Sequence, residues 1–299
     1  MSTRATRETI TVGVDGSPSS SRAIEYAVAD AVRRSATLRL VHAFAWPYLH
    51  VPTGPAPGTP ADGGLRGQAE QVLSTARSEA DAAAAAIAAT DLKVDVALVD
   101  GFPVAVLMAE STQADMIVIG DRGLGGFAGL LLGSTATQMI SHSHGPVTVV
   151  RGNTVRTGNV VAGVDGSASS LAALKFAAAE ARRRGVDVEA VMAWSRPRPT
   201  SAGDLLPLVY EPAAIEHEAR AVMSEAASAA RAACPDVCII ERLVHGRARR
   251  TLVGCSENAS LLIVGRHTHE FGSLGSVAGA LTHHAYCPVA VVPAHDLRA

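Results

Sequence analysis

The sequence predicts a doubly wound α/β protein with two tandem domains, and three observations indicate this. The segment Val12–Ser17 returns 150 positions later as Ala162–Ser167, with Gly-Val-Asp-Gly-Ser shared. Near the end of each copy, Pro146–Val150 is echoed by Pro288–Val292. Each copy also alternates apolar, β-branched runs with alanine-rich stretches, which is typical of strands and helices in a parallel sheet. The period is far longer than that of a solenoid repeat, so each copy is predicted to be a whole domain.

The domain boundaries follow from these echoes. We predict a first domain at 8–151, a polar linker at 152–159 and a second domain at 160–294. Each domain has about 140 residues, a size at which one chain buries a self-sufficient core.

The elements of the first copy can be read in order. The five expected strands are Ile10–Val14, Leu38–Phe44, Lys93–Val99, Met116–Gly120 and Val147–Val150. The expected helices between them are Ser19–Arg34, about Gly67–Ala89, Phe102–Ser111 and Ser134–Ser141. The strand runs are continuously apolar rather than alternating, which predicts burial on both faces of the sheet.

One connection differs from the others. Pro47–Gly64 is rich in proline and glycine and can continue neither the strand before it nor the helix after it. We expect a mobile flap at the carboxyl ends of the strands, with Ser195–Pro212 in the equivalent place of the second copy.

Composition excludes several classes of protein. The net charge of −2 gives no reason to expect nucleic acid, and the short runs Arg182–Arg184 and Arg249–Arg250 are interpreted as solvated helix faces. No stretch of about 18 apolar residues occurs, so membrane insertion is not expected. Since no apolar leader precedes the first strand, a cytoplasmic location is expected.

The four cysteines are expected to be free thiols. They are Cys234, Cys238, Cys255 and Cys287. The spacing of the first two fits neither a zinc pair nor a redox motif. His267 and His269 lie two positions apart, and no metal site is predicted from them.

The segment Gly120–Ser134 carries the strongest functional signal. It follows an expected strand, contains several glycines and enters a helix at Ser134. Glycines let backbone N–H groups turn around an anion, and Gly133, Ser134 and Thr135 add a helix N-terminus with two hydroxyl groups. Asp15 ends the first strand, where it can accept a hydrogen bond from a sugar or an amine, or simply form the turn before the helix. The sequence therefore predicts a phosphate-binding site at the strand ends.

Two common phosphate motifs are absent. Gly123-x-Gly125-x-x-Ala128 imitates a dinucleotide fingerprint, but it follows the fourth strand and no acidic residue stands about 20 positions on. A Walker A loop needs a lysine, and the only lysines are Lys93 and Lys175.

The chain resembles the universal stress protein family, of the ATP-binding kind. The family signature G-x2-G-x9-G-[S/T] is matched by Gly120, Gly123, Gly133 and Ser134 without a gap. The opening and closing segments of both copies are also similar to this family. The resemblance implies the strand order 3-2-1-4-5 in each domain. It further implies that the fifth strands, which look like exposed sheet edges, pair so that the halves form an intramolecular pseudo-dimer.

The resemblance also implies a ligand, ATP, with or without Mg²⁺. Asp15 and the backbone near Gly13 and Val41 would hold the adenosine. The residues expected around the phosphates are Gly120, Arg122, Gly123, Leu124, Gly125, Gly126, Gly133, Ser134 and Thr135. Because no base is positioned for water attack, binding is favoured over hydrolysis.

The implied function is that of an ATP-binding stress-response regulator that acts on an unidentified protein partner. The alternatives are a slow ATPase of a related α/β fold and a nucleotide-free interaction scaffold. The sequence leaves open whether the tandem chain also forms a homodimer.

The second copy departs from the signature. Thr268 stands where the second glycine of the signature belongs, and only six residues, instead of nine, separate it from Gly275. Glu270 places an anion where phosphate would lie. We therefore expect one tight site in the first domain. The residues of a second, weaker site would be Gly163, Asp165, Val191, Gly265, Gly275 and Ser276.

Overall fold

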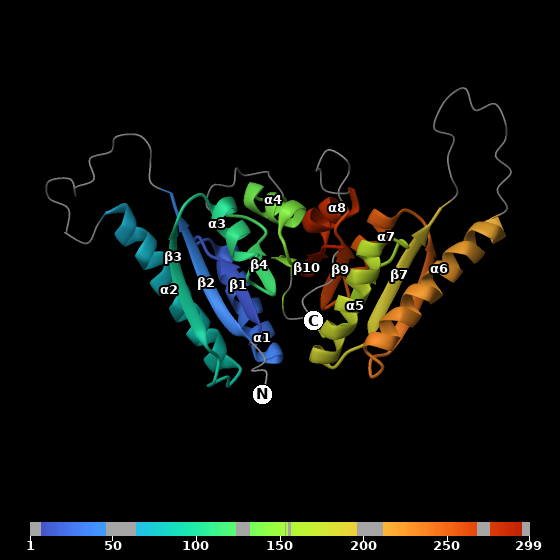
Figure 1. The fold of residues 1–299 in the computed structure, drawn as a ribbon, viewed down its shortest axis with the longest axis horizontal. Coiled ribbons are helices and arrows are strands. Elements are labelled where there is room, and N and C mark those ends of the chain that lie inside the picture. The colour runs from blue at the N-terminus through green and yellow to red at the C-terminus, as the bar shows by residue number, and fades with distance from the viewer. Residues whose placement is uncertain are drawn as a thin grey trace, which may run out of the picture. The chain divides into compact units, whose positions relative to one another are not determined.

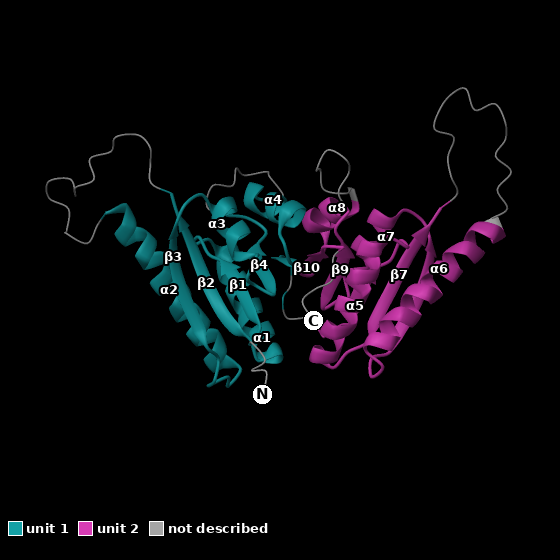
Figure 2. Ribbon diagram, in the orientation of Figure 1, with its two compact units in different colours: residues 1–154, 270–274, 297–299 teal, residues 155–269, 275–296 magenta. Residues whose placement is uncertain are grey.

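The computed structural model describes residues 7–45, 64–123, 132–152, 154, 157–195, 212–267 and 276–294. The chain divides into two compact units, and among the described residues the first runs to Thr154 and the second from 157 onward (Figure 2). Each unit has the parallel strands and covering helices that the sequence predicts, as Figure 1 shows. The predicted fold class is therefore confirmed.

The first unit is a five-stranded parallel sheet in the order β3-β2-β1-β4-β5. Its strands are β1 (Thr9–Gly13), β2 (Thr37–Phe44), β3 (Val94–Asp100), β4 (Met116–Gly120) and β5 (Val147–Val150). Its helices are α1 (Pro18–Arg34), α2 (Leu65–Ala86), α3 (Pro103–Glu110) and α4 (Ser134–His142). The helix α1 packs beside α2, and α3 packs beside α4. Right-handed crossovers put these two pairs on opposite faces, because the chain reverses its direction across the sheet after β3.

The second unit repeats this arrangement in the order β8-β7-β6-β9-β10. Its strands are β6 (Val160–Gly163), β7 (Val188–Trp194), β8 (Ile239–His245), β9 (Leu261–Gly265) and β10 (Val289–Val292). Its helices are α5 (Ala168–Arg184), α6 (Pro212–Ala233), α7 (Ala248–Cys255) and α8 (Ser276–His284). Both units therefore have the strand order that the family resemblance implies.

The first helix of each unit begins with the same cap. The Ser17 hydroxyl accepts a hydrogen bond from the N–H of Ser20, and the Ser167 hydroxyl accepts one from Ser170. Such a cap satisfies one of the N–H groups that a helix start leaves without a partner. In α1 the buried positions Ala23, Ile24 and Ala27 recur at helical spacing and turn one face onto the sheet.

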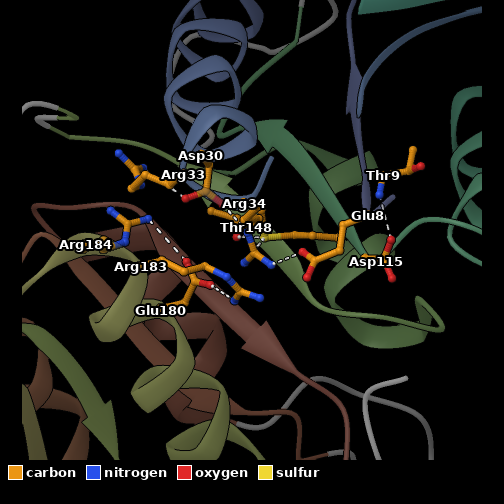
Figure 3. A network of polar contacts seen from close by, with 11 residues as sticks. Glu8, Thr9, Asp30, Arg33, Arg34, Asp115, Thr148, Glu180, Arg183 and Arg184 are labelled. Atoms are coloured by element: carbon orange, nitrogen blue, oxygen red, sulfur yellow. Dashed lines mark hydrogen bonds and ion pairs between the residues drawn. The ribbon is translucent and has the colours of Figure 1, made fainter. Parts of the chain in front are cut away.

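A buried acid near the end of this helix is a second shared feature, shown in Figure 3. In α1, Asp30 accepts hydrogen bonds from Arg33 and Arg34, at 3.0 and 2.9 Å. In α5, Glu180 takes the same place and forms ion pairs with Arg183 and Arg184. A carboxylate buried this deeply needs such partners, since an unpaired buried charge is costly.

The strands differ in how completely they are buried. Strands β1, β4 and β5 bury nearly all their side chains, as their apolar runs predict. The expectation of burial on both faces is wrong for β3, whose side chains are half-buried or exposed. The reason is its place at the end of the strand order, where only β2 pairs with it.

All four cysteines are free thiols, as predicted. Among the described residues, no helix is both long and apolar enough to cross a membrane.

Candidate functional site

A pocket of about 480 Å³ lies at the carboxyl ends of β1, β2 and β4, beside the start of α4. Chain connections leave β1 and β4 in opposite directions, and in doubly wound sheets this switch point is the usual ligand site. The predicted residues that line the pocket are Gly13, Asp15, Val41, Gly120, Arg122, Gly123, Gly133, Ser134 and Thr135. Leu124, Gly125 and Gly126 lie outside the described residues. The structure therefore gathers into one pocket every predicted residue of this site that it describes.

Asp15 serves both the turn and the pocket. Its Oδ1 accepts a hydrogen bond from the N–H of Ser17 at 3.0 Å, which shapes the turn into α1. Its other oxygen, Oδ2, faces Gly123, where an added Cβ would come within 2.5 Å of it. The two roles that the sequence left open for Asp15 are thus compatible.

This contact gives a local reason for Gly123. Its φ is not positive, so the backbone conformation alone does not call for glycine. A Cβ at this position would meet the Asp15 carboxylate, and that side chain would have to shift to admit it.

Gly120 is needed for packing between two elements. A Cβ at this position would lie 2.7 Å from the backbone carbonyl carbon of Ser19, so α1 rests directly on the end of β4. The start of the loop after β4 is also tied to α1. Asp121 accepts hydrogen bonds from the Ser19 hydroxyl at 2.7 Å and from Arg22 at 3.2 Å. These contacts fix where the predicted phosphate loop leaves the sheet.

The start of α4 has the properties of an anion site. Its N-cap is Gly133, which provides no side-chain hydrogen bond to the N–H groups of the first turn. Among the described residues, a Cβ on Gly133 would have no neighbour closer than 3.8 Å, and its φ of −70° is ordinary. Neither strain nor packing against the described residues therefore requires a glycine here, whereas close approach of a ligand would.

A cation and two hydroxyl groups border this helix start. Arg122 is exposed; its backbone carbonyl accepts a hydrogen bond from the Ser17 hydroxyl at 3.3 Å, while its guanidinium forms no hydrogen bond or ion pair with the residues that the structure describes. Ser134 and Thr135, the first residues of α4, line the same pocket. The helix dipole, the guanidinium and the hydroxyl groups all favour negative charge at this point.

Sequence reasoning missed part of the lining. The additional residues are Val14, His42, Ala43, Pro103, Leu107, Ile119, Leu132 and Ala136. The ring Nδ1 of His42 lies 2.7 Å from the Val14 carbonyl oxygen, which fixes the ring beside the strand end. The 4-residue spacing of Pro103 and Leu107 indicates one face of α3, but only the folded chain shows what that face contacts.

The second unit has a smaller pocket of about 180 Å³ in the equivalent place. Gly163, Asp165, Val191 and Gly265 line it, as predicted for the second site. Gly275 lies outside the described residues, and Ser276 is the first residue of α8. This volume is below the range of about 300–1,000 Å³ that is typical of pockets for drug-sized ligands.

Asp165 is engaged differently from Asp15. Its Oδ1 accepts hydrogen bonds from both the hydroxyl and the N–H of Ser167, at 2.6 and 3.0 Å. Burial alone would raise the pKa of Asp165, but the hydrogen bonds from Ser167 and Ser170, together with the nearby His267, outweigh it and lower the pKa below its ordinary value. The carboxylate is thus held by its own turn.

The loop after β9 has lost the tether seen in the first unit. Arg266 and His267 stand where the first unit has Asp121 and Arg122, and Ala172 replaces Arg22. Burial lowers the pKa of Arg266. The close packing is retained, since a Cβ at Gly265 would lie 2.5 Å from the carbonyl carbon of Ser169. The units therefore share a scaffold and differ in the groups that face the pocket.

Fold and pocket together define the class of protein, a tandem doubly wound α/β protein with a strand-end pocket suited to an anion. The chain belongs to the universal stress protein family, whose sequence profile matches residues 6–151 and 157–293.

Two relatives and one solved structure match nearly the whole chain. The chain is 33% identical to a universal stress protein of Mycobacterium tuberculosis strain H37Rv, with 97% of this chain and 96% of that protein covered. It is 31% identical to one from Mycolicibacterium smegmatis, with 96% and 98% covered. The crystal structure of a universal stress protein from Archaeoglobus fulgidus covers 96% of this chain and 98% of its own, with 17% identity and a TM-score of 0.69. A universal stress protein solved in complex with cAMP covers 48% of this chain, with 28% identity and a TM-score of 0.36.

Proposed function

We propose that the first unit binds ATP and that the chain acts as a nucleotide-dependent regulator of a stress response, without being an enzyme. One observation carries the proposal. A single pocket at the switch point combines a carboxylate, Asp15, with an exposed arginine, Arg122, and a helix start that no side chain caps. A nucleotide triphosphate has the chemistry to engage all three.

The residues fit the two ends of ATP. At the α4 end, free N–H groups, Ser134 and Thr135 would hold phosphate oxygens, while Arg122 would neutralise part of their charge. At the β1 end, Asp15 would accept from the sugar or the base, above an apolar wall that includes Val41 and Leu107. The volume of about 480 Å³ is in the usual range for such a ligand. A bound Mg²⁺ would add charge neutralisation between the phosphates.

The arrangement favours binding over hydrolysis. Among the described lining residues, the groups that could accept a proton are Asp15 and His42. Both come from the β1 and β2 side of the pocket, and each already contacts the backbone of that side. The phosphate groups are expected on the β4 and α4 side. A positioned general base would have to lie within hydrogen-bond reach of the attacking water.

The regulatory step stays a prediction. We infer that nucleotide occupancy changes the segment between β2 and α2 and so alters contacts with a protein partner. The predicted flap, Pro47–Gly64, lies outside the described residues except for Gly64, the N-cap of α2. A cytoplasmic location is part of the same proposal.

The test is to identify what the purified chain carries. The protein is purified without added nucleotide and denatured, and the released small molecules are analysed by mass spectrometry. Nucleotide-free protein, obtained by refolding or by exchange of the bound nucleotide, is then incubated with ATP. Intact ATP that co-purifies and is not consumed supports the proposal. Rapid multiple turnover would instead favour the ATPase, and an empty protein without measurable ATP affinity would favour the nucleotide-free scaffold.

A further inference from the structure

The second unit carries an open groove next to its strand-end pocket. The groove has a volume of about 1360 Å³ and follows the end of β8 and the start of α7. Its basic lining residues are Arg242, His245, Arg247, Arg249 and Arg250. It shares only Ala193, Ala248 and Val277 with the pocket around Asp165. None of the residues predicted for nucleotide binding lines this groove.

The first unit has no such concentration of charge at the matching positions. Strand pairing fixes the match, because Phe44 pairs with Asp100 in one unit and Trp194 pairs with His245 in the other. From this register, the three arginines at 247, 249 and 250 stand where the first unit has Phe102, Val104 and Ala105. Among the described residues, this cluster of arginines is therefore found in the second unit and not at the matching positions of the first.

The same comparison shows that acids have been removed. His245 replaces Asp100, and Cys255 replaces Glu110, which pairs with Arg39 in the first unit. Burial raises the pKa of the Cys255 thiol, so it adds no negative charge at neutral pH. The carboxylate of Glu189 lines the groove, and it is paired with Arg242. That pair leaves Arg247, Arg249 and Arg250 as the excess charge.

These three arginines stand where a helix disfavours them. Arg247 is the N-cap of α7, without a side-chain hydrogen bond to the first turn, and Arg249 and Arg250 lie within that turn. The first turn has no acidic residue. Cations at this end oppose the helix dipole and repel one another. Local rules of this kind are expected to be broken at functional or strained sites.

No compensating group is present in the described part of the chain. All three side chains belong to exposed residues, and none forms a hydrogen bond or ion pair with a described residue. Each guanidinium can bind a phosphate through two parallel hydrogen bonds. One phosphate group carries at most about two negative charges, which does not balance three arginines and a helix N-terminus.

We propose that this groove binds a small molecule with two or more phosphate groups. Arg247 and Arg250 are three positions apart and lie on one side of the helix, where they can grip one phosphate, while Arg249 reaches a second. Trp194 is not a lining residue, but its neighbours Ala193 and Ser195 line the groove, and its ring centroid lies 4.7 Å from that of the lining residue His245. This proposal does not depend on ATP binding by the first unit.

The test uses Trp194 as a reporter of occupancy. The full chain contains two tryptophans, so Trp46→Phe leaves Trp194 as the only one. A Gly133→Asp change blocks the first-unit site and keeps the two proposals separable. Fluorescence is then titrated with inorganic tripolyphosphate, pyrophosphate and orthophosphate. Affinity is expected to fall in that order, and to weaken as salt rises.

Two charge-matched variants decide whether the arginines are responsible. Replacing Arg247, Arg249 and Arg250 with glutamine should lower tripolyphosphate affinity by about 100-fold or more, because several charge-assisted hydrogen bonds are lost. The same number of charges removed elsewhere on the second unit, by Lys175→Gln, Arg182→Gln and Arg220→Gln, should change it by less than about threefold. The groove variant should also unfold at a higher temperature without ligand, since repulsion is relieved.

Three results would overturn the proposal. They are equal affinity for orthophosphate and tripolyphosphate, equal losses in both variants, and tighter binding of a short oligonucleotide or an acidic peptide than of tripolyphosphate. A first unit that fails to bind ATP would leave the expected results for the groove unchanged.

Discussion

The glycines around the first-unit pocket have different physical reasons. Gly120 is required by the Ser19 backbone, whereas a side chain at Gly123 would make the Asp15 carboxylate shift. Gly133 has room for a side chain among the described residues and an ordinary backbone conformation. A signature that the sequence presents as one pattern therefore contains positions fixed by packing and one position that we attribute to the ligand.

The variant Gly133→Asp tests whether the glycine at this position serves the ligand or the packing of the protein. Aspartate is a favoured N-cap, so the variant should be as stable as the parent or up to about 1 kcal/mol more stable without nucleotide. The same carboxylate would occupy the N–H groups proposed for phosphate and repel its charge, so ATP affinity should fall by about 100-fold or more. Thermal unfolding and calorimetry measure the two effects. Unchanged ATP affinity in a folded variant would show that the start of α4 does not hold phosphate.

The free thiols should differ in reactivity. Cys238 is exposed, Cys234 and Cys287 are buried, and burial raises the pKa of Cys255. Only the thiolate is alkylated, so a raised pKa leaves less reactive thiolate at a given pH. In iodoacetamide labelling followed by peptide mass spectrometry, Cys238 should react first at neutral pH. Cys255 should need a more alkaline pH, and labelling of Cys255 as fast as Cys238 at neutral pH would contradict this.

Among the elements, the contact of the first helix on the fourth strand is the same in both units. It is closest at Gly120 in one unit and at Gly265 in the other, where a Cβ would overlap the backbone of Ser19 or Ser169. This contact places the start of the loop after β4 or β9 next to the turn that holds Asp15 or Asp165. The scaffold for a strand-end site is thus kept even where the loop has changed.

Alanine at these glycines should therefore destabilise both units alike. Gly120→Ala and Gly265→Ala each force overlap with backbone and should cost about 1–3 kcal/mol or more. Gly254→Ala is the control, because it lies inside α7 with nothing within 4 Å, and it should add about 0.5–1 kcal/mol of stability. Chemical denaturation measures these changes. A Gly120→Ala variant as stable as Gly254→Ala would rule out the close contact.

Elements determined by the local apolar pattern could be predicted from the sequence, whereas features that depend on the folded sheet could not. The apolar runs predicted the cores of the strands, because burial on a sheet imposes that pattern. The repeated segments at the start and end of each copy predicted the two domains. The exposure of β3 could not be predicted, since it depends on the strand's place in the order. The expected helix at Gly67–Ala89 is shifted from the observed Leu65–Ala86, because alanine runs do not mark a helix end.

The candidate site likewise contains residues that the sequence predicted and residues that only the fold reveals. A spaced-glycine signature located Gly120, Gly133 and Ser134 on the pocket. It could not reveal His42, which reaches the pocket only because β2 lies beside β1, or the contact of Asp15 with Gly123. The basic groove was also missed. Arg249 and Arg250 are exposed on α7, as predicted, but they gain a shared role only when Arg242 and Arg247 join them.

Across the two units, the chain combines one scaffold with two sets of surface groups. The first unit keeps the complete signature and the larger pocket, of about 480 Å³ against 180 Å³. The second has lost the tether around Asp121 and has gained the arginines of its groove. We infer that duplication freed the second unit to bind a different anion. The implied pairing of the halves into a pseudo-dimer stays a prediction.

Calorimetric titration of ATP into the full chain tests whether the first unit, and not the second, binds ATP. It is best performed with Arg247, Arg249 and Arg250 replaced by glutamine, so that the groove does not contribute. One site per chain is predicted. Asp15→Ala should abolish most of the binding, whereas Asp165→Ala should leave it almost unchanged. Two equivalent sites per chain, or binding that is lost with Asp165→Ala and kept with Asp15→Ala, would contradict the assignment of ATP to the first unit.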